Sequence, residues 1–117
     1  MGLSYIDGTV TGPSGIQRQV RFLVDSGATY TLLPLEAWQA IGLKPVRRIQ
    51  CVLADGATIE RDVSECQLSL PQGSAHTPVI LGQAEDEPLL GAVTLEILGL
   101  VLNPFQRSLQ PMRMMLA

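Results

Sequence analysis

Aromatic residues are scarce in this sequence, where two Phe, two Tyr and one Trp account for 4% of the 117 residues. Hydrophobic residues still reach 46%, so the core must be built from aliphatic side chains. Leu, Val and Ile recur in short runs broken by Gly and Pro, which favours many short strands over long helices. A chain of this length supports one modest core, so residues 1–117 are predicted to form a single, mostly β domain.

Positive charge is limited too, and the net charge is -3. Arg47 and Arg48 are the only adjacent cations, so the basic stripe of a nucleic-acid binder is missing. The longest apolar stretch, Leu95 to Leu102, is interrupted by Glu96 and Gly99 and falls short of the roughly 20 apolar residues that span a bilayer. The N-terminus lacks the basic region and apolar block of a secretory signal. We therefore expect a cytoplasmic protein with neither a nucleic-acid nor a membrane partner.

Metal-binding residues are few as well. His76 is the only histidine, and Cys51 and Cys66 do not have the spacing of metal ligands. The sequence therefore predicts no metal site. The two cysteines could pair on adjacent strands, but without an export signal we expect free thiols rather than a disulfide.

The chain divides into short elements separated by turn signals. Gly12-Pro13-Ser14-Gly15 and Asp55-Gly56 are typical of hairpin turns, and Pro34 suits the start of a short helix. Residues 71–78, between two prolines, are predicted to form a loop. Strands are predicted at residues 4–11, 16–24, 31–33, 46–53, 58–70, 79–81, 100–102 and 108–117, and helices at 35–41 and 92–98.

Asp25 is the best candidate for a catalytic carboxylate. It follows the apolar run Phe22-Leu23-Val24 and precedes Ser26-Gly27-Ala28. Asp, Ser and Gly are common turn formers, so the triplet alone has a simple explanation as a loop. However, placing a carboxylate at the end of a buried strand costs free energy, and a residue that only formed a turn would not need to be a carboxylate there. Gly27 would also allow close approach to a ligand, and Thr31-Leu32-Leu33 resumes an apolar strand at once.

Two later features accompany this loop, namely the hairpin around Asp55-Gly56 and the element Leu89-Leu90-Gly91 before Ala92. In this order, over Ile6 to Leu102, the motifs resemble the retropepsins, the retroviral-type, single-domain aspartic proteases and their bacterial and cellular relatives. The resemblance implies an all-β, closed β-barrel of the acid-protease fold with a flap hairpin and one or two short helices. It implies a homodimer, because pepsin-like enzymes carry two such Asp loops in one chain and this sequence carries one. No cofactor is expected.

The resemblance also implies a role for each site residue. Asp25 would be the catalytic residue, and the Ser26 hydroxyl would hydrogen-bond to the partner's loop. Gly27 would accept backbone hydrogen bonds from the substrate, and Ala28 would pack beneath the loop. The flap, which closes over an extended peptide, would consist of Ala54, Asp55, Gly56, Ala57 and Thr58.

Physical chemistry agrees with a dimer. Aspartic proteolysis uses two nearby carboxylates that share one proton, one activating a water and the other polarising the peptide carbonyl. A single Asp25 cannot do this, whereas a two-fold axis brings Asp25 next to its symmetry mate. We therefore predict an aspartic endopeptidase acting on peptides or proteins. Its groove should favour apolar side chains, with walls formed by Leu23, Val52, Ile80 and Leu81.

Other interpretations stay open at this point. A non-catalytic module could use the same fold to dimerise and bind peptides, although the intact Asp25-Ser26-Gly27 favours a protease. A specialised hydrolase could cleave itself, since the termini and the predicted loop at 71–78 are accessible. Several further residues have simpler structural explanations. We expect His76 at the surface, Trp38 in the core, and Asp7 and Asp62 on solvent-facing sides of strands. Core or dimer packing, or else an adaptable binding surface, is expected for Met112, Met114 and Met115.

Overall fold

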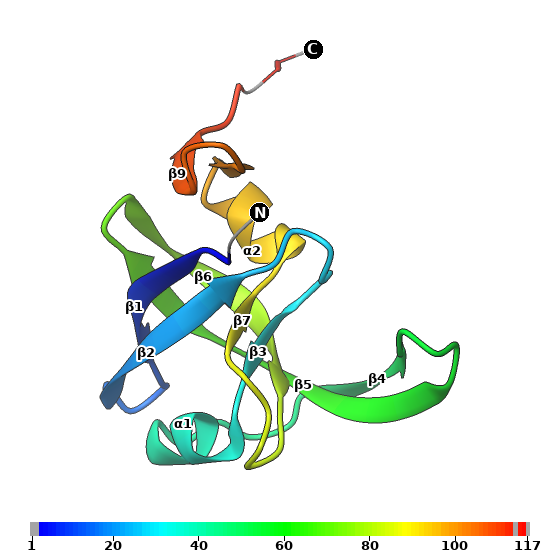
Figure 1. Cartoon of the computed structure of the whole chain (residues 1–117). Coiled ribbons are helices and arrows are strands. Elements are labelled where there is room, and N and C mark those ends of the chain that lie inside the picture. Colours follow the sequence, from blue (N-terminus) through cyan, green and yellow to red (C-terminus); the bar gives the residue numbers. More distant parts are fainter. Residues whose placement is uncertain (1–2, 114, 117) are drawn as a thin grey trace.

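The structure is a computed structural model that describes residues 3–113 and 115–116 (Figure 1). The mostly β composition predicted from the sequence is confirmed. Within the described residues, the elements are β1 (Tyr5–Thr11), β2 (Gln17–Val24), β3 (Thr31–Leu33), α1 (Leu35–Ala40), β4 (Arg47–Val52), β5 (Thr58–Leu70), β6 (Gly73–Leu81), β7 (Leu89–Leu90), α2 (Ala92–Ile97), β8 (Leu100–Asn103) and β9 (Ser108–Pro111).

One 7-stranded sheet forms the body, in the order β1-β2-β7-β3-β6-β5-β4. An additional pairing between β1 and β5 closes this sheet into a ring. The β2–β7 and β3–β6 pairings are parallel and join segments that lie far apart in the sequence. In Figure 1 the β4–β5 hairpin extends from the ring to the right, while β8 and β9 form a separate hairpin above α2.

Alternation of side chains along the strands explains the interior of the ring. In β2, Val20, Phe22 and Val24 are buried, whereas Gln19 and Arg21 face solvent. A strand that alternates in this way places every second side chain in the core. The core is almost entirely aliphatic, as the composition predicted, with Phe22 its only fully buried aromatic residue among those described.

Helix α1 begins directly after Pro34, and Gly42, with φ of 77°, marks its end. Trp38 on this helix is half-buried and packs against the core. Its indole Nε1 donates a hydrogen bond to the carbonyl of Gly82 over 2.8 Å. Trp38, which was predicted to lie in the core, therefore also links α1 to the segment that follows β6.

The prediction of a loop at residues 71–78 was wrong. Strand β6 begins at Gly73 and pairs with β5 through a tight connection, in a register that places Leu70 opposite Gly73. Pro78 lies just before the segment that pairs with β3, so β6 has a neighbour on one side only there, and such edges tolerate proline. His76 is nevertheless exposed as predicted, on a strand rather than a loop.

The C-terminal strand is shorter than predicted. β9 ends at Pro111, where the sequence suggested a strand over 108–117. Met112 is half-buried and Met115 is exposed, whereas Met114 lies outside the described residues.

Cys51 and Cys66 are both free thiols, the first half-buried and the second buried. Among the described residues, no helix combines the length and apolar character needed to cross a membrane.

Candidate active site

The Asp25 loop is fastened to β7. Leu23 and Val24 pair in parallel with Leu89 and Leu90, and the Asp25 N–H donates to the Leu90 carbonyl over 3.0 Å. The apolar strand and the later apolar pair therefore hold the base of the loop from two sides. Asp25 itself is half-buried at this junction.

Inside the loop, backbone groups fix the carboxylate. The Gly27 N–H donates to Asp25 Oδ1 over 3.0 Å, and the Ala28 N–H donates to the Asp25 carbonyl over 3.1 Å. A Cβ at Gly27 would lie 3.2 Å from Asp25 Oδ1, tighter than most such contacts. Ser26 and Gly27 are exposed and Ala28 is half-buried, so the tip of the loop faces outward.

Helix α2 supports the far side of the loop. Its first N–H groups, from Ala92 and Val93, donate to the carbonyls of Ala28 and Thr29 over 2.8 and 3.0 Å. Gly91 makes this approach possible, because a Cβ there would lie 2.5 Å from the carbonyl carbon of Tyr30. The glycine of the apolar-apolar-Gly element is therefore required by close packing of two backbones.

A buried threonine network lies behind the loop. Thr31 and Thr94 hydroxyls lie 2.6 Å apart, and Thr77 lies 2.8 Å from Thr94. Thr31 Oγ1 also accepts a hydrogen bond from the Gly91 N–H over 3.0 Å. Sequence reasoning missed this set, because these threonines come from β3, β6 and α2 and only the fold brings them together.

The predicted flap is the β4–β5 hairpin. Its tip closes by a Leu53 N–H to Ala57 carbonyl hydrogen bond of 2.8 Å, and Asp55 Oδ1 accepts from the Ala57 N–H over 2.9 Å. Gly56 has φ of 86°, a conformation that favours glycine. All residues from Ala54 to Thr58 are exposed.

The base of the hairpin contacts the loop region through a pair that the sequence did not suggest. Arg47 Nη2 donates to the Tyr30 hydroxyl over 2.9 Å, and the guanidinium lies 5.7 Å from the centre of the Tyr30 ring. This contact joins β4 to the segment that follows Ala28.

A groove of about 590 Å³ separates the loop from the hairpin. Gly27 and Ala28 form part of one wall, and Val52 and Ile80, both predicted, line it as well. The prediction that Leu23 and Leu81 form the walls was wrong. Neither residue lines the groove, and Leu81 is buried in the core. Asp25 is not in the lining either, but Gly27, whose N–H donates to the Asp25 carboxylate, is. The remaining lining residues are Thr29, Tyr30, Leu32, Ile49, Gln50, Cys51, Leu53, Ile59, Arg61, Asp86 and Leu89.

Metal-binding side chains do not cluster in the part of the chain that the structure describes. Within residues 3–113 and 115–116, no group of three or more His, Cys, Asp or Glu residues is arranged to hold a metal ion.

A ring of strands that holds an Asp-Ser-Gly loop against an apolar-apolar-Gly element, facing a hairpin across a groove, defines the acid-protease fold. The family of aspartyl proteases matches this chain over residues 6–100. The chain therefore belongs to the aspartyl protease family and is an aspartic endopeptidase by class. No curated protein matches its sequence.

Solved structures share this fold. The chain is similar to the protease of simian foamy virus (mac), with a TM-score of 0.56 and 16% identity over 79% of this chain and 91% of that one. It is also similar to a retropepsin-like aspartic protease from Rickettsia conorii, with a TM-score of 0.56 and 22% identity over 81% of this chain and 70% of that one. The predicted resemblance to retropepsin-like proteases is thereby confirmed.

Proposed function

We propose that two copies of this chain form a homodimeric endopeptidase in which the paired Asp25 carboxylates activate one water molecule. The observation that carries the proposal is the single Asp-Ser-Gly loop of the sequence, whose tip is exposed. One carboxylate alone lacks the second group that aspartic proteolysis needs. The exposed loop tip is available to meet its symmetry mate.

The chemistry divides between the two carboxyl groups. The ionised one removes a proton from water as its oxygen attacks the carbonyl carbon of the peptide bond. The protonated one donates to the carbonyl oxygen, which carries the developing negative charge. Transfer of a proton to the amide nitrogen then breaks the C–N bond and releases an amine and a carboxylic acid. The Gly27 N–H contributes by holding Asp25 Oδ1 in place.

Exposed apolar residues support a dimer. Ile97, Val101 and Phe105 are 46%, 47% and 89% exposed. They come from α2, β8 and the turn before β9, and Figure 1 shows these elements at the same end of the molecule as the loop that follows β2. A partner seated there would cover apolar surface and bring the two loops together.

The groove supports an extended peptide as substrate. Leu32, Ile49, Ile59, Ile80 and Leu89 give it largely aliphatic walls. Apolar walls with a few polar groups are typical of binding clefts, so apolar side chains should be preferred.

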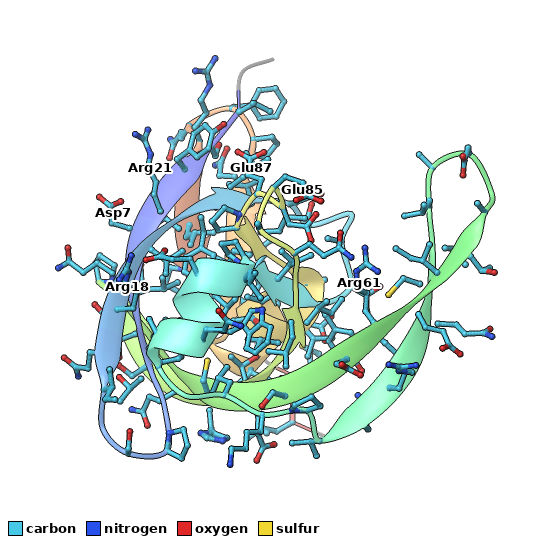
Figure 2. The ribbon with its side chains drawn as sticks, turned by 90° about the horizontal axis from the view of Figure 1, so that it is seen from below. Asp7, Arg18, Arg21, Arg61, Glu85 and Glu87 are labelled. Atoms are coloured by element: carbon cyan, nitrogen blue, oxygen red, sulfur yellow. The ribbon has the colours of Figure 1, made fainter. Side chains whose placement is uncertain are left out.

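Replacement of Asp25 tests the proposal. Asp25→Asn keeps the size of the side chain but removes the charge, and we expect cleavage of fluorogenic peptides to fall by roughly 10²–10⁴-fold. Asp7→Asn, an exposed position on β1 (Figure 2), is the matched control and should retain activity. Equal activity of Asp25→Asn and wild type would contradict the catalytic role.

Mixing the two proteins tests the dimer. With equal amounts of wild type and Asp25→Asn, random association leaves about a quarter of the dimers with two intact carboxylates. The activity per wild-type chain should therefore fall to about half, whereas added Asp7→Asn should not lower it. If the mixture had the full activity of its wild-type chains, a site shared by two chains would be contradicted. Tight peptide binding without turnover would instead favour a non-catalytic peptide-binding module.

A further inference from the structure

The β4–β5 hairpin has two chemically different faces. On the outer face, Arg48 forms ion pairs with Glu60 over 3.2 Å and with Asp62 over 3.3 Å. On the inner face, Ile49 lies opposite Arg61, and both residues line the groove. The outer arginine is therefore neutralised within the hairpin, whereas Arg61 lines the groove.

Arg61 is the unusual member of the inner face. Its neighbours in the groove wall, Ile49, Cys51 and Ile59, are apolar, and the Arg61 side chain is half-buried among them. Figure 2 shows Arg61 inside the curve between the hairpin and the body of the molecule. A guanidinium in an apolar wall loses hydration, which is costly unless an anion compensates for it.

No carboxylate of the described residues compensates Arg61. Its Nη1 donates to the carbonyl of Glu60 over 3.1 Å, and none of the ion pairs within residues 3–113 and 115–116 includes it. Asp86 lines the same groove, but its Oδ2 accepts from the Gln83 N–H over 2.7 Å and is held in its own turn. Most of the donors of Arg61 therefore stay available to a bound molecule.

We propose that Arg61 is a specificity-determining residue that selects peptide substrates with an acidic side chain next to an apolar one. A guanidinium presents donors in a planar fork that matches a carboxylate, and these charge-assisted hydrogen bonds are strong. The aliphatic walls around it take the neighbouring apolar side chain. This inference rests on the proposed peptidase function, because it requires an extended peptide in the groove.

Peptide pairs that differ only by Glu or Gln, with the substitution moved along the sequence, test this inference. At one position, wild type should prefer Glu by roughly tenfold or more in kcat/KM. Arg61→Gln should lose that preference while still cleaving the Gln peptide. Arg61→Glu should reverse the preference toward a Lys peptide, a result that a purely structural role of Arg61 would not produce. Arg48→Gln, on the outer face of the same hairpin, is the matched control and should keep the preference for Glu.

Binding separates this inference from the proposed function. The same Glu and Gln peptides can be titrated against Asp25→Asn, where Kd reports the preference without turnover. A preference for the Glu peptide in Kd supports the role of Arg61 even if wild type cleaves no peptide. Failure of wild type to cleave any peptide would overturn only the peptidase function. Equal kcat/KM and equal Kd for every pair, or an equal loss of preference in Arg48→Gln, would overturn the role of Arg61.

Discussion

At the residue scale, backbone groups hold Asp25 on three sides. Its N–H is bound to Leu90, its carboxylate to Gly27 and its carbonyl to Ala28. The carboxylate therefore has one preferred orientation before any substrate arrives, which reduces the cost of reaching a reactive geometry. The threonine network behind the loop adds rigidity, because Thr31 connects Gly91 to Thr94.

Cys66 gives a pH-dependent prediction. Burial in the core raises the pKa of its thiol to about 12, from 9.0 in an ordinary environment. Above pH 9 the unfolded chain loses this proton while the folded chain keeps it, so stability should fall as the pH rises from about 9 to 12. The slope from this one group is at most roughly 1.4 kcal/mol per pH unit. Urea unfolding of wild type and Cys66→Val at several pH values measures this contribution as the difference between their slopes of unfolding free energy against pH.

The other cysteine is the control for that experiment. Cys51→Ser keeps Cys66 and should show the wild-type slope. In native protein, iodoacetamide should modify Cys51, which is half-buried on the hairpin, and should reach Cys66 only on unfolding. Rapid modification of Cys66 in the folded protein, or identical slopes for wild type and Cys66→Val, would contradict its assigned burial.

The junction of β7 and α2 is the element on which the loop depends. Two N–H groups of the helix bind loop carbonyls, and this is possible only because Gly91 has no side chain. Leu89-Leu90-Gly91 is recognisable as a motif in the sequence, but the reason for its glycine is visible only in the packed structure.

Gly91→Ala should therefore be destabilising. With φ of -95° the alanine backbone is unstrained, so the penalty comes from the 2.5 Å approach to Tyr30. We expect a loss of about 1–3 kcal/mol in urea unfolding, together with reduced peptidase activity. Gly15→Ala, where nothing lies within 4 Å but φ is 87°, should cost only the backbone strain of about 1–2 kcal/mol and leave activity intact. Full activity of Gly91→Ala would contradict the role of this contact.

The elements also show where sequence patterns are insufficient. Strands β2 and β5 were predicted to within one residue because their polarity alternates along their length. In strand β6 only residues 79–81 were predicted, and residues 73–78 were missed because Gly73 and Pro78 usually interrupt strands. Its pairing partner β5 continues beside it, and the hydrogen bonds of that neighbour outweigh the local preference.

At the scale of the whole molecule, the ring carries one Asp-Ser-Gly loop, which in the proposed homodimer would supply half of the active site. The loop, α2 and the β8–β9 hairpin lie at one end (Figure 1), where exposed apolar side chains gather. The homodimer and the cytoplasmic location expected from the sequence both stay predictions, and the first can be tested directly in solution.

Phe105→Asp should weaken the dimer. Phe105 is 89% exposed at the turn of the β8–β9 hairpin, and a buried carboxylate without a partner would be costly in an interface. Sedimentation should show a tenfold or greater rise in the dissociation constant, corresponding to about 1.4 kcal/mol or more, with activity lost at low protein concentration. Ile16→Asp, 52% exposed at the β1–β2 turn, which lies at the opposite end of the molecule (Figure 1), is the matched control and should sediment as wild type does. Unchanged sedimentation of Phe105→Asp would place the interface elsewhere.

The sequence by itself determined the mostly β domain, the position of Asp25 at the end of an apolar strand and the hairpin around Asp55-Gly56. These depend on alternation and turn residues, which are local properties of the chain. Tertiary structure decided the rest: the ring closed by β1 and β5, the meeting of Thr31, Thr77 and Thr94, and the inner position of Arg61. Each of these comes from pairing between residues far apart in the chain, which no local pattern records. Asp25 was identifiable as a carboxylate in a loop, but its fixed orientation required β7 and α2.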